Sequence, residues 1–218
     1  MKIQTEPFRK ISEGTAAEIC KRVDLSAEAA AFLVPGLSPQ GYLALLVDAR
    51  QVGDAVRFLA FTLPIREGVW WACVVAHSNL AEPTTTQSLA LDRTANWVYE
   101  PNDTNRRSCM EAAESSNLEG APAYAALAAF WSGGSMAPEN MPEALPDPKL
   151  GPIGVGASVL LSIASGDAAH QNTRFEKAIE RGVDIANGGN GRLDGDRPIR
   201  MQPSLQASEQ TAGHRTGF

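Results

Sequence analysis

Residues 65–80 read IREGVWWACVVAHSNL, and this stretch decides the fold. Its apolar side chains, from Val69 through Val75, fall on every side of a helix and leave no continuous polar face. A helix without a polar face is a buried helix, so we expect this segment at the centre of the protein. The β-branched residues also allow a strand, but the length of the run and the absence of alternating polarity favour a helix.

Helical periodicity extends on both sides of this segment. Ser26, Ser38-Pro39 and Thr84 are typical helix-start residues, because a hydroxyl caps free backbone N–H groups and proline fits the first turn. No strand-like alternation persists anywhere in the sequence. The predicted helices cover residues 15–23, 26–34, 38–63 with a bend at Gly53, 65–80, 84–98, 102–116, 122–131, 153–165 and 168–186.

The sequence therefore predicts an all-α fold, a single bundle of about eight or nine helices within residues 15–188. A superhelix of helical repeats is the alternative, because several helices are rich in alanine. We expect residues 1–14 to form an extended lead-in. Residues 189–218 are rich in Gly, Pro, Ser, Gln and Arg, which predicts a flexible, disordered C-terminal tail.

A long connection is predicted within residues 121–152, which read APAYAALAAFWSGGSMAPENMPEALPDPKLGP. Two glycines close an alanine-rich helix there, whereas a phosphate-binding loop would open one. The prolines that follow predict a rigid, Pro-rich crossover loop of about 18 residues, longer than bundle packing requires. Long ordered loops often carry function. The candidate protein-binding residues are therefore Trp131, Ser132, Gly133, Gly134 and Ser135, with Arg66 and Arg106 as charged neighbours. The alternatives are that the tryptophan packs in the core and that the arginines pair with carboxylates of the same chain.

Composition and charge limit the classes of function. The chain has 218 residues, is 44% hydrophobic and carries a net charge of -6, so it can bury a core but offers no basic balance for nucleic acid. Its three cysteines have no paired spacing, which is typical of a reducing cytoplasm. No signal-peptide pattern or membrane-spanning run is visible, so we expect a cytoplasmic protein without membrane insertion. Another protein or a small molecule is the expected partner.

Catalytic and metal-binding patterns are weak. Cys73 and His77 lie four residues apart on one helical face, but a zinc site needs further ligands that the sequence does not pair with them. The string GGNGRLDGD at residues 188–196 departs from the EF-hand spacing, and a flexible linker is the more common structure for such a string. No nucleophile motif is present. We predict no catalytic residue, no metal and no cofactor, and hence a protein that is not an enzyme.

Several strings carry a resemblance to a known family. They are REGVWWA at 66–72, WVYEPNDTNRR at 97–107, PAYAALAAFWSGGSMAP at 122–138 and, after an apolar helix, FEKAIERGVDIANGG at 175–189. Over residues 15–188 the sequence resembles an uncharacterised bacterial all-helical domain family encoded near type VI secretion genes for spike proteins, PAAR-type tips and effectors. The resemblance implies an accessory role, that of a chaperone-like adaptor in effector loading. It assigns no catalytic residue.

Three hypotheses about function follow. The first is a non-catalytic cytoplasmic adaptor that binds another protein, such as a secretion-system effector or spike component. The alternative is a small-molecule-binding or enzymatic helical domain with a pocket near Trp131–Ser135. The third assigns binding to the proline run and the tail, acting as an extended peptide.

Overall fold

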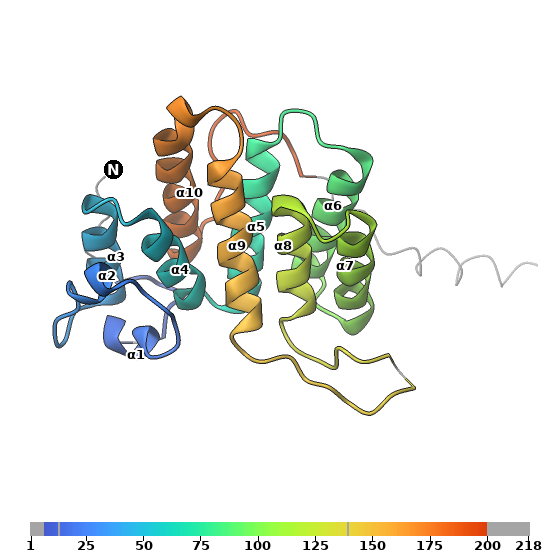
Figure 1. Ribbon diagram of the computed structural model, residues 1–218, viewed down its shortest axis with the longest axis horizontal. Helices are drawn as coiled ribbons and strands as arrows, with labels where there is room; N and C mark the ends of the chain where they lie inside the picture. Colours follow the sequence, from blue (N-terminus) through green and yellow to red (C-terminus); the bar gives the residue numbers. More distant parts are fainter. Residues whose placement is uncertain (1–6, 13, 139, 200–218) are drawn as a thin grey trace, which may run out of the picture.

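The computed structural model describes residues 7–12, 14–138 and 140–199 (Figure 1). Within these ranges the chain forms helices and no strand, which confirms the all-α prediction. The helices are α1 (Ala16–Cys20), α2 (Ala27–Ala30), α3 (Pro39–Asp48), α4 (Val52–Thr62), α5 (Ile65–Asn79), α6 (Thr85–Tyr99), α7 (Asp103–Ser115), α8 (Gly120–Phe130), α9 (Leu150–Ala164), the short 3-10 helix η1 (Ala168–His170) and α10 (Gln171–Ala186).

Helix α5 lies at the centre of the bundle, as its sequence predicts. It packs against α6, α8, α9 and α10, and Figure 1 shows α1–α4 on one side of the α5–α9 pair and α6–α8 on the other. Trp71 is fully buried, and its indole N–H donates to the Ala178 carbonyl of α10 at 2.7 Å. The adjacent Trp70 is half-buried, because successive residues of a helix point about 100° apart.

Helices α8 and α9 are antiparallel neighbours that approach closely because small residues line their contact (Figure 1). A Cβ atom at Gly154 of α9 would lie only 3.1 Å from the Ala128 Cα atom of α8. The close approach therefore requires glycine at this position. Since α8 ends and α9 begins on the same side of the bundle, the loop that joins them projects from that side (Figure 1).

Several helix boundaries differ from those predicted, and two of the differences have a clear local cause. The bend expected at Gly53 is instead a break at residues 49–51, where Arg50 adopts a φ of 54°, and Gly53 lies inside α4. Helix α9 begins at Leu150, three residues earlier than predicted, so Pro152 lies in its first turn. Proline is tolerated there because the first N–H groups of a helix have no helical acceptor. The break between α3 and α4 raises the number of α-helices in the described residues to ten.

The predicted lead-in packs on the bundle. Phe8 is buried, and the Lys10 N–H donates to the Ala186 carbonyl at the end of α10 at 3.0 Å. The Lys10 ammonium pairs with the Glu67 carboxylate of α5 at 3.0 Å. Residues 7–12 are therefore part of the folded unit, while residues 1–6 and 13 of the predicted lead-in lie outside the described residues.

The segment after α10 also packs on the bundle. The buried Arg181 guanidinium binds both carboxylate oxygens of Asp196, with Nη2 2.7 Å from Oδ1, and also donates to the Gly191 carbonyl. Trp70 donates to the Asn190 carbonyl at 2.8 Å. Residues 189–199 are thus held against α5 and α10, which corrects the prediction that a flexible tail begins at residue 189. The disordered tail predicted over residues 200–218 lies outside the described residues.

Candidate functional site

The loop at residues 131–149 carries most of the candidate residues and projects from the end of the bundle (Figure 1). Helix α8 ends at Phe130 with Trp131 as its C-cap residue, and Gly134, three residues further on, has the predicted left-handed conformation with a φ of 66°. Further along, the Met136 N–H donates to the Ala144 carbonyl at 2.8 Å. The Ser135 hydroxyl oxygen accepts from the N–H groups of Ala137 and Ala144, both at 3.1 Å. These bonds join the two arms of the loop at its base.

Arg106 of α7 anchors this base from inside the protein. Its guanidinium is buried, donating to the Phe130 carbonyl at 2.9 Å and to the Ser135 carbonyl at 2.8 Å. It also lies 4.8 Å from the centre of the Phe130 ring, a cation–π distance. Arg106 therefore positions the loop. It was predicted as a charged neighbour for a partner, but its contacts are internal.

The next arginine supports the same loop from a more exposed position. Arg107 donates to the Ala137 carbonyl at 3.1 Å and to the Ser135 carbonyl at 3.3 Å. Both arginines also bind the carboxylate of Asp103. Hydrogen bonds from Arg107 and then from Arg106 hold the pKa of Asp103 below its usual value, because they stabilise its charged form.

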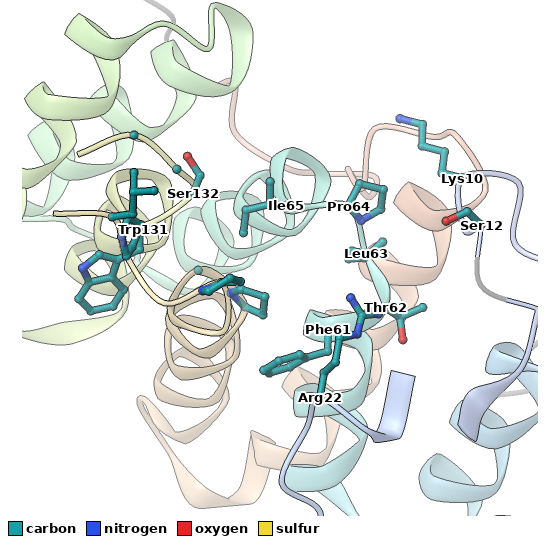
Figure 2. Close-up of a pocket in the computed structure, with 17 residues that line it drawn as sticks. Lys10, Ser12, Arg22, Phe61, Thr62, Leu63, Pro64, Ile65, Trp131 and Ser132 are labelled. Carbon is teal, nitrogen blue, oxygen red and sulfur yellow. The ribbon is translucent and has the colours of Figure 1, made fainter. Parts of the chain in front are cut away.

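A pocket of about 550 Å³ lies beside the start of this loop (Figure 2). In Figure 2, Trp131 and Ser132 lie on one side, Lys10 and Ser12 on the other, and Ile65 between them. Apolar groups from the α4–α5 junction and from the second arm of the loop form much of the wall. The lining residues are Lys10, Ser12, Arg22, Phe61, Thr62, Leu63, Pro64, Ile65, Trp131, Ser132, Gly133, Gly134, Leu145, Pro146, Pro148, Gly151 and Pro152.

The structure thus brings together Trp131, Ser132, Gly133 and Gly134 of the candidate residues at one pocket. It places Ser135 among the hydrogen bonds of the loop base and does not include it in the lining. The predicted pocket near Trp131–Ser135 is therefore present. The described residues that line it contain no His, Cys, Asp or Glu, so they supply cationic, hydroxyl and apolar groups for binding.

Arg66 lies apart from the other candidate residues. Its guanidinium donates to the Val98 carbonyl at 2.6 Å and to the Tyr99 carbonyl at 3.2 Å, which caps the end of α6. It lines a second pocket of about 310 Å³ with Trp70 and Tyr99. Arginine near a helix C-terminus satisfies carbonyls that have no helical donor. The contacts of Arg66 are thus those of a helix cap.

Sequence reasoning missed Lys10, Ser12 and Arg22 as pocket residues. They come from the lead-in and from the end of α1, more than one hundred residues before Trp131. Neither segment has a motif or periodicity that links it to the crossover loop. The packing of residues 7–12 on α5 and α10 brings Lys10 and Ser12 to the pocket, and the packing of α1 against α3 and α4 brings Arg22 there.

Cys73 is buried on α5, and His77, one turn later, is half-buried. The Cys73 thiol lies 3.7 Å from the Leu91 carbonyl, and burial raises its pKa well above the usual range. Burial also raises the pKa of the Cys109 thiol to about 12 and lowers that of His77. Within the described part of the chain, no group of three or more His, Cys, Asp or Glu side chains is placed to hold a metal ion.

The fold and the site define an all-α protein with an open, cation-bearing pocket beside a long loop at one end of a helical bundle. The profile described as "Family of unknown function (DUF6931)" matches residues 42–186, which is more than half of the chain. The protein belongs to this family. The expectation of an uncharacterised family is confirmed to that extent, and the match carries no link to secretion genes or to bacteria. It runs from within α3 to the end of α10 and does not reach the segments that supply Lys10 and Arg22.

No curated protein and no solved structure matches the chain. Among the helices of the described residues, none is both long enough and apolar enough to cross a membrane.

Proposed function

We propose that this protein is a non-catalytic accessory protein that binds another protein through the exposed side of the crossover loop. One observation carries the proposal: the base of the loop is fixed by a buried arginine, while its apolar side chains face solvent. Met136, Met141 and Leu145 are 36%, 62% and 64% exposed. We call these three residues the loop face.

The loop face has the properties of a binding surface. Methionine is common on surfaces that bind proteins, because its flexible thioether adapts to different partners. Exposed apolar side chains on a loop that is fixed at its base are open to contact by a partner. A loop already fixed at its base loses little conformational entropy when it binds, which favours affinity. Trp131 is half-buried at the foot of the loop, where an aromatic anchor commonly contributes most to binding.

The more specific proposal is that the partner is an effector or spike component of a type VI secretion system, bound in the cytoplasm before loading. It is supported by the resemblance of residues 66–72, 97–107 and 122–138 to a family encoded beside such genes. That support is an association with neighbouring genes. The experiment below therefore tests the loop face and the identity of the partner separately.

The test is co-purification of the tagged full-length chain with each effector or spike protein encoded beside it. We expect one of them to be retained and the double variant Met136→Ser/Met141→Ser to lose most of that binding. The matched control is Leu45→Ser/Leu161→Ser, which removes two exposed leucines, 40% and 41% exposed, outside the loop. Unchanged binding by the methionine variant would refute the role of the loop face in recognition. Failure of every effector and spike protein encoded beside it to bind would refute the role in secretion.

The tail hypothesis has its own variant. Deleting residues 189–218 would also remove Asp196, the partner of Arg181, and so would disturb the fold. A deletion of residues 200–218 leaves that pair intact. Partner binding that persists in this shorter deletion, and is lost in the methionine variant, assigns recognition to the loop rather than to the tail.

A further inference from the structure

The segment that follows α10 is held to the bundle largely by polar contacts. We call residues 190–199 the strap, and Gly191 is the one buried residue within it. The middle of the strap is fixed by the ion pair of the buried Arg181 with Asp196, and its outer end is held by Arg197. A segment that buries little apolar surface opens locally at a low cost in free energy. The contacts of Arg197 therefore decide whether the outer end stays in place.

Arg197 binds the end of α5 through backbone carbonyls. Its guanidinium donates to the Ala81 carbonyl at 2.9 Å, to the His77 carbonyl at 3.3 Å and also to the Leu80 carbonyl. Two residues later, Ile199 packs on a small apolar cluster. The buried members of this cluster are Cys73, Ala76, Leu91 and Ala95. Figure 1 shows the strap near the end of α5 that leads into α6, at the opposite end of the bundle from the crossover loop.

Three guanidinium groups and one carboxylate act on the His77 side chain. Arg181 belongs to α10, whereas Arg192, Asp196 and Arg197 belong to the strap. The carboxylate is bound by Arg181. Arg192 donates to the Arg197 carbonyl at 3.1 Å, and Arg197 donates to carbonyls of α5, so neither of these two charges is neutralised by its hydrogen bonds. The half-buried His77 imidazole therefore lies in an excess of positive charge.

The last turn of a helix would by itself favour a protonated histidine, because the C-terminal end carries partial negative charge. At the end of α5, however, Arg197 already supplies a positive charge and binds the free carbonyls. A second cation there gains little from the helix dipole and is repelled by the first. We propose that protonation of His77 releases the outer end of the strap, residues 197–199, and uncovers part of the apolar cluster beneath Ile199. The pair of Arg181 with Asp196 keeps the rest of the strap in place.

The pH range of this release follows from the histidine. Burial and then the charge of Arg197 lower the pKa of His77, and Asp196 offsets only part of that effect. The closed strap therefore binds the proton more weakly than the open one. Closure is favoured above the ordinary histidine pKa of about 6.5 and weakens as the pH falls below it. Asp196 stays ionised in this range, because the hydrogen bond from Arg181 lowers its pKa.

The experiment follows isoleucine methyl groups by NMR in the full-length protein. Ile199→Val assigns the resonance of Ile199, and Ile179→Val assigns that of Ile179, which is fully buried in α10 and serves as the internal control. From about pH 7.5 to about pH 5.5 we expect the Ile199 resonance to move as the released fraction rises at least about threefold, while the Ile179 resonance stays in place. No movement of Ile199 overturns the proposal. Movement of both resonances also overturns it, because the whole bundle would then be loosening.

Substitutions then assign the response to one histidine. His77→Gln removes the titrating group, so we expect Ile199 to stay in place at both pH values. The matched control is His170→Gln, because His170 lies in a pocket wall with Asp196 but is 71% exposed and pairs with Asp167 at 3.3 Å. A pH response that persists in His77→Gln, or is lost equally in His170→Gln, overturns the proposal. The variant Met136→Ser/Met141→Ser changes only the loop face and is expected to keep the response, so the two proposals fail independently.

Discussion

Replacing Arg106 with methionine tests how the crossover loop is held. The change keeps a long side chain but removes the guanidinium that donates to the Phe130 and Ser135 carbonyls at 2.9 and 2.8 Å. Each hydrogen bond from a charged donor contributes about 1.5–3 kcal/mol, and the contact with the Phe130 ring adds roughly 0.5–2 kcal/mol. The Asp103 carboxylate is more than half exposed, so its pair with Arg106 adds less than about 1 kcal/mol.

Methionine recovers part of this loss by burying apolar surface, so we expect Arg106→Met to lower the free energy of unfolding by about 3 kcal/mol. For a chain of this length that corresponds to a fall in Tm of roughly 6–12 °C. The assay is equilibrium unfolding in urea followed by circular dichroism. Arg107→Met is the matched control, because Arg107 has longer bonds to the same loop and a side chain that is 26% exposed.

We expect Arg107→Met to lower the free energy of unfolding by about 1 kcal/mol and Arg106→Lys to fall between the two methionine variants, since one ammonium lacks the planar fork that bridges two carbonyls. Equal losses for Arg106→Met and Arg107→Met would refute the reasoning, because they would show that burial of the guanidinium does not matter. A loss below about 1 kcal/mol for Arg106→Met would also refute it.

Three further changes test the packing of the chain. Arg181 lowers the pKa of Asp196, so their pair stabilises the fold above the unfolded pKa of about 4, and this contribution disappears as the pH falls through the folded pKa. Asp196→Asn should therefore lower the free energy of unfolding in urea by about 2 kcal/mol at neutral pH but by little in strong acid. Gly134 and Gly36 both have positive φ, so alanine at either position should lower the free energy of unfolding by about 1 kcal/mol. Gly134→Ala should cost more, because only there would the new Cβ lie 3.0 Å from a guanidinium, and a smaller loss at Gly134 in urea unfolding would contradict this. Gly182→Ala would place a Cβ 2.6 Å from a core leucine and should lower Tm through a loss of about 1–3 kcal/mol, and an unchanged Tm would contradict the packing.

The central helix and most helix starts could be predicted from the sequence because they depend on local patterns. Residues 65–80 lack a polar face, and α5 is indeed surrounded by other helices. Ser38 and Thr84 accept hydrogen bonds from backbone N–H groups three residues later, as helix-start residues do. The break after α3 was missed because Arg50 adopts the left-handed conformation there, and arginine does not signal it.

The limits of the folded unit and the roles of the arginines could not be predicted because they depend on contacts distant in sequence. Residues 189–196 have the composition of a flexible linker, but Arg181 holds Asp196 and so fixes the segment. Arg106 and Arg66 were predicted as partner contacts because a free guanidinium commonly pairs across an interface. In the structure each donates to carbonyls at least 24 residues away, and no local pattern indicates these contacts.

The internal role of Arg106 strengthens the case for the loop as a binding surface. Burying a guanidinium removes it from water, and a loop that only connected two antiparallel helices would need no such anchor. The anchor fixes the base of the loop before a partner arrives, so less entropy is lost on binding. Arg106→Met should therefore weaken partner binding although Arg106 is only 4% exposed and does not reach the loop face. If that variant is folded and still binds its partner as tightly as the unchanged protein, pre-ordering of the loop is not what supports recognition.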